Sequence, residues 1–193
     1  MIAYLKGRLA EKSPTYVVID CQGVGYFLHI SLHTYEQLPL DENVKIYTYL
    51  QVREDAHTLF GFMQVQEREI FKKLISVSGI GASTARTMLS SLSPQEVVEA
   101  ITQEDVDVIK SVKGIGTKTA QRVIIDLKDK LGDHLEQAQI SMPQGNSAKQ
   151  EALSALETLG YSAKQSEKVV QRILKETPDS TVQQIIKLAL KNL

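Results

Sequence analysis

Leu74-Ile-Ser-Val-Ser-Gly-Ile-Gly-Ala-Ser-Thr-Ala-Arg86 and Ile109-Lys-Ser-Val-Lys-Gly-Ile-Gly-Thr-Lys-Thr-Ala-Gln121 are two copies of one pattern, offset by 35 residues. The identical pairs are Ser76/Ser111, Val77/Val112, Gly79/Gly114, Ile80/Ile115, Gly81/Gly116, Thr84/Thr119 and Ala85/Ala120. Apolar residues at helical spacing flank both copies, so each copy predicts a helix, a turn at Gly-Ile-Gly and a second helix.

The Gly-Ile-Gly turn has a physical logic. Glycine suits a turn in which φ is positive, or in which a Cβ atom would obstruct a neighbouring backbone. The central isoleucine, Ile80 or Ile115, would anchor the turn in the core. The second helix would then present its unpaired N-terminal amides outward, where a phosphate oxygen can bind. We therefore predict that the sugar-phosphate backbone of DNA is contacted at Gly79, Gly81, Gly114 and Gly116.

The charge distribution supports this prediction, although the formal net charge is −1. Residues 71–92 carry three basic side chains and no acid, and residues 109–130 carry six basic side chains and two acids. Residues 93–108, which lie between these blocks, carry five acids and no base. Lys118 and Arg122 share a helix face in the second copy, so we expect them to add phosphate contacts. Nothing in the pattern reads base edges, and the predicted binding is therefore independent of sequence.

Two nucleotide-binding glycine motifs do not fit these residues. A P-loop needs glycine directly before the Lys118-Thr119 pair, where Thr117 stands. A dinucleotide-binding fingerprint needs a third glycine at position 84 or 119, and both are threonine. The sequence thus predicts no nucleotide cofactor, while an αα-hairpin with a purely structural glycine turn stays open for each copy.

The first 63 residues are predicted to form β-strands. Apolar and polar residues alternate in residues 24–30 and 44–52, which is the pattern of half-buried strands. A β-branched run at Tyr16–Ile19 predicts a further strand, and Gln22-Gly23 predicts a turn after it. About five short strands in this length favour a small closed barrel of the OB type.

Beyond Gln64 the apolar residues recur at the spacing of a helix. Residues 64–132 are therefore predicted to form a tandem hairpin domain. Its long last helix is expected to start near Lys118 and to end at Gly132. Residues 133–147 predict a flexible linker. Residues 148–193 predict three helices in a small bundle, the kind of tethered module that serves for docking.

Capping signals predict where several helices begin. Ser93-Pro-Gln-Glu96 has the residues of a capping box, with proline at the first helical position. Thr102–Asp105 is expected to open a further short helix, and Ser162–Gln165 a capping box in the C-terminal module.

Composition excludes several classes of protein. The hydrophobic fraction of 42% and charged fraction of 23% are those of a globular protein, and no apolar run approaches the ~20 residues that span a bilayer. The N-terminal residues lack the pattern of a signal peptide, so a cytoplasmic location is expected. The single cysteine and the four histidines, which are His29, His33, His57 and His134, lack metal-ligand spacing, and no metal is expected.

The paired Gly-Ile-Gly motifs resemble the helix-hairpin-helix family. Together with Gly23-Val-Gly-Tyr26, Val52-Arg-Glu-Asp-Ala56 and Leu156-Glu-Thr-Leu-Gly-Tyr161, they resemble the RuvA family of Holliday-junction-binding subunits along essentially the whole chain. The resemblance implies an α+β multidomain protein. It would comprise an OB-like β-barrel, a central double helix-hairpin-helix domain and a C-terminal three-helix, UBA-like bundle.

The resemblance also implies a function and partners. Members of this family form homotetramers that hold a four-way junction open and flat in homologous recombination and DNA repair. The third domain, here residues 148–193, recruits the hexameric RuvB ATPase, which drives branch migration, and the RuvC resolvase can cut the junction. Such a subunit is not catalytic. Whether one or two tetramers hold a junction, and which residues contact RuvB, stay open.

Glu54 and Asp55 on their own predict a solvated charged turn between two strands. The resemblance implies that they form an acidic pin at the four-fold centre. Carboxylates repel phosphates, so an acidic centre surrounded by basic hairpins lets the arms bind but keeps strands out of the middle.

The first hairpin departs from the family pattern. Relatives often carry a basic residue two positions after its second glycine, where this chain has Ser83. The resemblance then implies that this hairpin relies on backbone amides and the Ser83 hydroxyl, and whether Arg86 replaces the missing cation stays open.

Two other classes of function compete with junction recognition. A nuclease or lyase subunit would need a catalytic lysine or a metal-binding acid cluster, and neither has convincing context in this sequence. A protein-interaction adaptor would use the hairpins as structure only and would bind no DNA.

Overall fold

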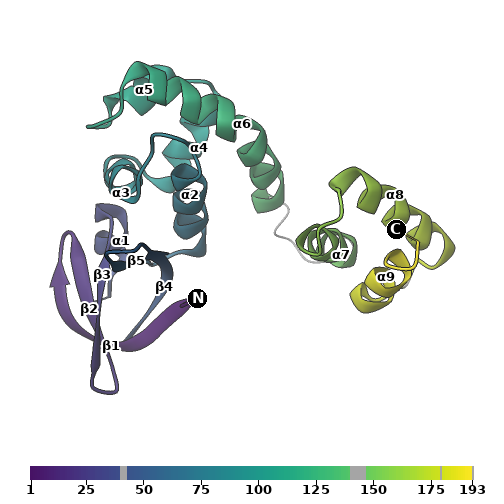
Figure 1. Cartoon of the computed structure of the whole chain (residues 1–193), viewed down its shortest axis with the longest axis horizontal. Helices are drawn as coiled ribbons and strands as arrows, with labels where there is room; N and C mark the ends of the chain where they lie inside the picture. Colours follow the sequence, from purple (N-terminus) through teal and green to yellow (C-terminus); the bar gives the residue numbers. More distant parts are fainter. Residues whose placement is uncertain (40–42, 140–146, 179, 193) are drawn as a thin grey trace. The chain divides into compact units, whose positions relative to one another are not determined.

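The computed structural model describes residues 1–39, 43–139, 147–178 and 180–192 (Figure 1). They form two compact units, Met1–Ala138 and Gln139–Leu193. Residues 140–146, which belong to the predicted linker, lie outside the described residues.

The N-terminal strands close into a barrel, as the alternating pattern predicts. They are β1 (Tyr4–Ser13), β2 (Tyr16–Cys21), β3 (Val24–His29), β4 (Asn43–Val52) and β5 (His57–Phe62). Their order around the barrel is β1-β2-β3-β5-β4, with a parallel pair at β3–β5 and antiparallel pairs elsewhere. The pairs Val17↔Leu28 and Leu5↔Ile46 place apolar side chains inside, where they are buried. The OB-like barrel is confirmed.

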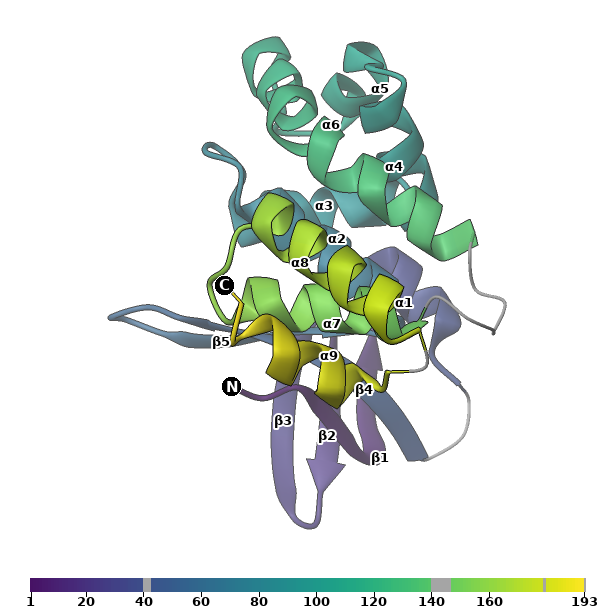
Figure 2. The ribbon, with the colours of Figure 1, turned by 90° about the vertical axis from the view of Figure 1, so that its right-hand side faces the viewer.

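The helices that follow the barrel in the first unit lie at one end of it (Figures 1 and 2). They are α2 (Val65–Ile75), α3 (Ala82–Ser91), α4 (Pro94–Thr102), α5 (Val106–Ser111) and α6 (Thr117–Gln139). Phe60 and Phe62 of the barrel belong to the same core as these helices. Their ring centroids lie 5.1 Å and 5.0 Å from that of Phe71 in α2. This shared core fixes the barrel against the helices.

A buried polar cluster makes a second connection between barrel and helices. Glu67 of α2 is fully buried, and it accepts hydrogen bonds from the hydroxyls of Ser31 and Thr34, the latter at 2.6 Å. Ser31 is also the N-cap of a short helix, α1 (Leu32–Gln37), between β3 and β4. Burial raises the pKa of the Glu67 carboxyl, and the two hydroxyl donors partly oppose that rise.

The helix ends confirm some capping predictions and correct others. The Ser93 capping box is confirmed, with proline at the start of α4. Thr102 ends α4, so the next helix begins at Val106 and not at Thr102; Asp105 caps it by accepting from two backbone amides.

The prediction that Gly132 ends the long helix is wrong, because α6 continues to Gln139. The first part of the predicted linker is therefore helical. A glycine inside a helix costs only about 1 kcal/mol relative to alanine. The leucine, glutamate, glutamine and alanine residues that follow Gly132 are good helix formers, and no proline intervenes.

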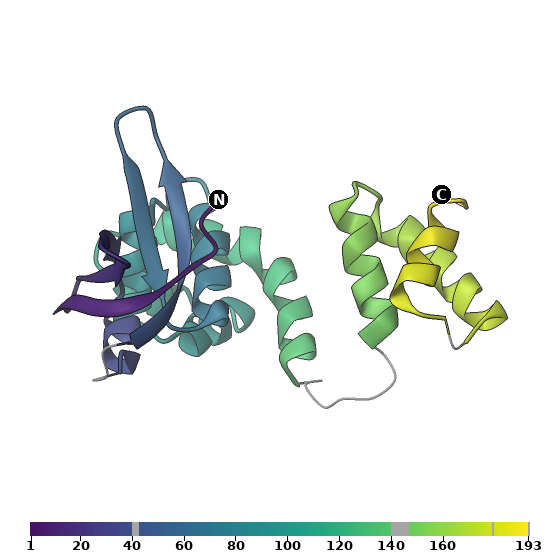
Figure 3. The same cartoon turned by 90° about the horizontal axis from the view of Figure 1, so that it is seen from below.

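The second unit is the expected three-helix bundle, formed by α7 (Ser147–Thr158), α8 (Ala163–Glu176) and α9 (Val182–Ala189) (Figure 3). Its core contains Ala152, Leu156, Val170, Ile173, Ile185 and Ala189. The predicted capping box at Ser162 is wrong, because the Gln165 amide donates to the Ser162 carbonyl and the Ser162 hydroxyl bonds to the Gln165 side chain. A capping box forms instead at the start of α9, between Thr181 and Gln184.

Candidate nucleic-acid interface

The two hairpin turns have the same backbone geometry. Gly79 has a φ of 97° and Gly114 a φ of 92°, the left-handed region in which glycine is favoured. In both turns the central isoleucine amide donates to the carbonyl three residues before it, at 3.0 Å for Ile80 and 3.1 Å for Ile115. Both isoleucines are only 5% exposed. The predicted anchoring of each turn by its isoleucine is confirmed.

The second glycine of each turn, Gly81 or Gly116, precedes a helix. Gly81 is the N-cap of α3, has an ordinary φ of −87° and provides no side-chain cap. A Cβ atom added at either glycine would meet nothing within 4 Å. The packing of the chain itself therefore does not require glycine at these positions, and the space in front of both helices is open to a partner.

The first-turn amides of α3 and α6 are the donors that face this space. The first helical hydrogen bonds run from Ala85 to the Gly81 carbonyl and from Ala120 to the Gly116 carbonyl, both at 2.9 Å. The amides between these residues have no partner within their helix, which is the usual state of a helix N-terminus and suits an anion. The two hairpins pack together, because Ile80 and Ile115 belong to one buried core, and a Cβ atom built on Gly79 would lie 3.8 Å from Cγ2 of Thr119.

The candidate side chains of the second hairpin lie beside its turn. Lys118 and Arg122 are exposed on the first two turns of α6, and Lys113 is exposed just before Gly114. Throughout the part of the chain that the structure describes, Lys118 and Arg122 make no hydrogen bond or ion pair. Their charges are free to meet an external anion.

In the first hairpin, Ser83 and Arg86 lie in different settings. Ser83 is exposed in the first turn of α3. Arg86 is half-buried against the barrel, where its Nη1 donates to the Thr15 carbonyl at 3.2 Å and contacts Nδ1 of His29 at 3.3 Å.

The acidic pin, Glu54 and Asp55, lies at the tip of the β4–β5 hairpin, and both residues are exposed. The Arg53 amide donates to the Ala56 carbonyl at 2.9 Å and closes the turn. Figure 3 shows this hairpin, in blue, extending away from the rest of the barrel. Asp55 and Ser83 line one cleft, so the pin and the first hairpin adjoin each other on the surface.

That cleft also contains Arg53 and His29, for which the sequence predicted no role in DNA binding. Arg53 is the basic member of the pin motif Val52-Arg-Glu-Asp-Ala56, and that position could have drawn attention to it. The contact between His29 and Arg86 joins residues that are 57 positions apart, so no local sequence pattern predicts it.

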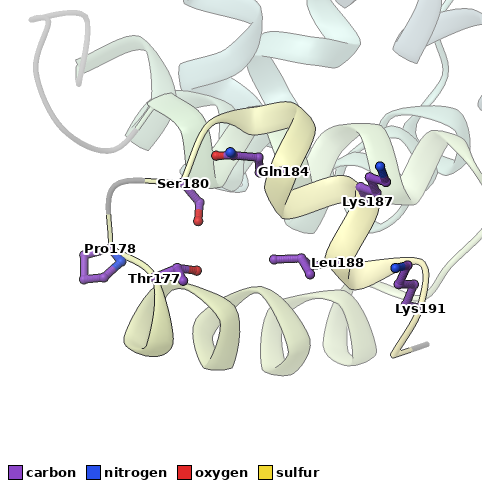
Figure 4. Close-up of a pocket in the computed structure, with 7 residues that line it drawn as sticks. All are labelled: Thr177, Pro178, Ser180, Gln184, Lys187, Leu188 and Lys191. Atoms are coloured by element: carbon purple, nitrogen blue, oxygen red, sulfur yellow. The ribbon is translucent and has the colours of Figure 1, made fainter.

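The second unit contains a groove of about 600 Å³ between the end of α8 and α9 (Figure 4). Its lining residues are Thr177, Pro178, Ser180, Gln184, Lys187, Leu188 and Lys191. In Figure 4 the two lysines lie at one end and Thr177 and Pro178 at the other. The groove combines an apolar side chain with two cations.

The described residues offer neither a metal-binding cluster nor a membrane-spanning helix. Among the side chains that the structure places, which exclude those of residues 40–42, 129–130, 132–147, 179 and 193, no group of three or more histidine, cysteine, aspartate or glutamate residues could hold a metal ion. Among the described residues, no helix is both long and apolar enough to cross a membrane.

Two touching hairpins with open helix N-termini, joined through a common core to an OB-like barrel, define a tandem helix-hairpin-helix protein. Three family models match the chain: the RuvA N terminal domain at residues 1–61, the SAM-like helix-hairpin-helix tandem at 71–129 and the RuvA C-terminal domain at 147–193. The chain belongs to the RuvA family.

Three full-length relatives share the name "Holliday junction branch migration complex subunit RuvA". The protein of Christiangramia forsetii is 62% identical and that of Flavobacterium psychrophilum 58% identical, each over 193 residues and 100% of both chains. The protein of Bacteroides thetaiotaomicron is 51% identical over 201 aligned positions, again covering 100% of both chains.

Proposed function

We propose that this chain binds four-way DNA junctions through their sugar-phosphate backbone, without sequence preference and without catalysis. The observation that carries the proposal is the contact between two hairpins whose helix N-termini are open to a partner. The DNA contacts are assigned to Gly79, Gly81, Ser83, Gly114, Gly116, Lys118 and Arg122. These positions offer backbone amides, a hydroxyl and two cations, and none of them is arranged to read bases.

The acidic pin accounts for a preference for junctions over continuous duplex. Glu54 and Asp55 are exposed, and Asp55 lines the same cleft as Ser83 of the first hairpin, so DNA held by the hairpins would pass close to the pin. A duplex that continued across the pin would be repelled, whereas the four arms of an open junction leave the centre free. We further propose that four copies of the chain surround this centre, each contributing one pin.

We also propose that the chain works in the cytoplasm as the DNA-binding subunit of a branch-migration complex. Residues 148–193 would recruit the RuvB ATPase, which supplies ATP hydrolysis, and RuvC would act on the held junction. The separate core of the second unit supports this assignment, because a separate unit can bind a partner without disturbing the hairpins. A chain that lacks residues 147–193 should bind junctions as before but fail to stimulate branch migration by RuvB.

Hydroxyl-radical footprinting of a synthetic junction tests the binding mode. The expected result is protection of the backbone on all four arms close to the crossover, unchanged when the arm sequences are exchanged. Protection that follows one sequence, or that is confined to the arm ends, would contradict the proposal.

A further inference from the structure

The cleft between the acidic pin and the first hairpin contains more positive than negative charge. It has a volume of about 270 Å³ and includes Arg53, Asp55, Arg86 and His29. Burial and the neighbouring Arg86 guanidinium lower the pKa of His29, which keeps its imidazole neutral at physiological pH. Two guanidinium groups and one carboxylate therefore remain, and the net charge of the cleft is +1.

Arg86 is a half-buried cation whose protein partners are neutral. Both of its hydrogen-bonding contacts, to the Thr15 carbonyl and to Nδ1 of His29, are made by Nη1. Arginine can only donate, so the histidine nitrogen accepts and its proton resides on Nε2. Across the described ranges no carboxylate pairs with Arg86, which leaves a partly desolvated charge uncompensated.

The geometry of these contacts leaves the phosphate-binding edge of Arg86 free. Nη1 fixes the guanidinium against the barrel, while Nε and Nη2 have no acceptor among the residues that the structure describes. That pair of donors is the fork that binds two oxygens of one phosphate group. Arg53 is exposed in the same cleft, and its side chain likewise makes no hydrogen bond or ion pair within the described ranges.

We propose that Arg86 and Arg53 each bind a backbone phosphate of the DNA strand that passes between the first hairpin and the acidic pin. Arg86 thereby supplies, from the second turn of α3, the cation that Ser83 does not supply from the first. Asp55 borders the same cleft, so the strand is attracted on the arginine side and repelled from the pin. This assignment rests on the proposed junction binding and specifies which residues hold the strand nearest the centre.

The test is the salt dependence of junction binding by the full-length protein. Arg86→Gln and Arg53→Gln should each weaken binding to a synthetic four-way junction about tenfold. Each should also reduce the slope of log affinity against log salt by about 0.9 for every bound subunit. Lys168→Gln, which removes an exposed cation from α8 in the second unit, is the matched control and should leave both values unchanged.

Two further measurements distinguish the loss of a positive charge from a disturbance of the fold. Arg53 has no side-chain hydrogen bond or ion pair to lose within the described residues, so Arg53→Gln should unfold thermally like the wild type even if Arg86→Gln loosens α3 from the barrel. In the double variant Ser83→Lys with Arg86→Gln, the lysine should restore the salt slope, because it returns one cation to the first hairpin. Failure of this rescue would overturn the idea that Arg86 takes the place of a cation at position 83.

The results also distinguish the arginine site from the proposed function. If the wild type prefers the junction over duplex but both glutamine variants keep its salt slope, the arginine site is wrong and junction binding stands. If the wild type shows no preference for the junction, the proposed function fails.

Discussion

Thr119, in the first turn of α6, lies beside Gly79 in the turn of the other hairpin, close enough that a methyl group on Gly79 would contact its Cγ2 atom, although 40 positions separate the two residues in the sequence. Because of this contact, the two open helix N-termini belong to one surface before any DNA is bound. A surface that is already ordered binds its ligand at a smaller entropic cost than one that must be assembled.

The two glycines of each turn should respond differently to substitution. Gly114→Ala should lower the free energy of unfolding by about 1 to 2 kcal/mol, because alanine is strained at a φ of 92°. Gly116→Ala should change it by less than about 0.5 kcal/mol, since no atom lies within 4 Å of the added methyl group, yet it should weaken junction binding by obstructing the phosphate. Urea unfolding and junction affinity are measured for both variants. Wild-type affinity in the Gly116→Ala protein would rule out close approach of the DNA backbone at this turn.

The cations of α6 should contribute to affinity without contributing to specificity. Lys118→Ala with Arg122→Ala should weaken binding to every junction sequence tested, and each lost cation should reduce the salt slope by about 0.9 per bound subunit. Titrations at several salt concentrations measure the slope, with Lys168→Ala as the control for general loss of positive charge. Unchanged affinity in the double variant would show that these two side chains do not contact phosphates.

Reversal of the charge of the pin should strengthen binding rather than abolish it. Glu54→Lys with Asp55→Lys converts repulsion of phosphates into attraction, so the affinity for linear duplex should rise. The ratio of junction affinity to duplex affinity should therefore become smaller. The turn should survive, because the backbone hydrogen bond from Arg53 to Ala56 closes it. Loss of all DNA binding, with the fold intact by circular dichroism, would mean that the turn has a different role.

Glu67 should make the stability of the first unit depend on pH. Burial raises its folded pKa above the ordinary value of 4.5, so protonation favours the folded state. Its contribution to the free energy of unfolding is therefore fully present below pH 4.5 and is lost as the pH rises through the raised pKa. Glu67→Gln removes this titration. Relative to that variant, the wild type should gain stability as the pH falls from neutrality toward 4.5. A difference that stays constant over this range would show that Glu67 does not titrate there.

Much of the fold was predictable because its signals are local. The alternation of apolar and polar residues along β4 indicates that one face of the strand is buried in the barrel. The repeat around Gly79 and Gly114 indicates two turns in which the first glycine needs a positive φ. The acidic pin could be placed between two strands from the flanking pattern alone, since β4 ends at Val52 and β5 begins at His57.

The features that the sequence did not predict depend on distant contacts. Helix α1 has only six residues, and its cap, Ser31, is held by Glu67 from 36 positions away. The contact between Arg86 and His29 exists only once the barrel is folded against α3. The contact between Gly79 and Thr119 likewise depends on how the two hairpins pack, which the repeat alone does not specify.

Recognition of a four-way junction through its backbone is tested most directly by one comparison. The affinity of the wild-type protein is measured for a synthetic four-way junction and for a linear duplex built from the same arm sequences, at two salt concentrations. We predict tighter binding to the junction at both concentrations and a steep loss of affinity with salt for both DNAs. Equal affinity for junction and duplex, or binding that does not respond to salt, would contradict this mode of recognition.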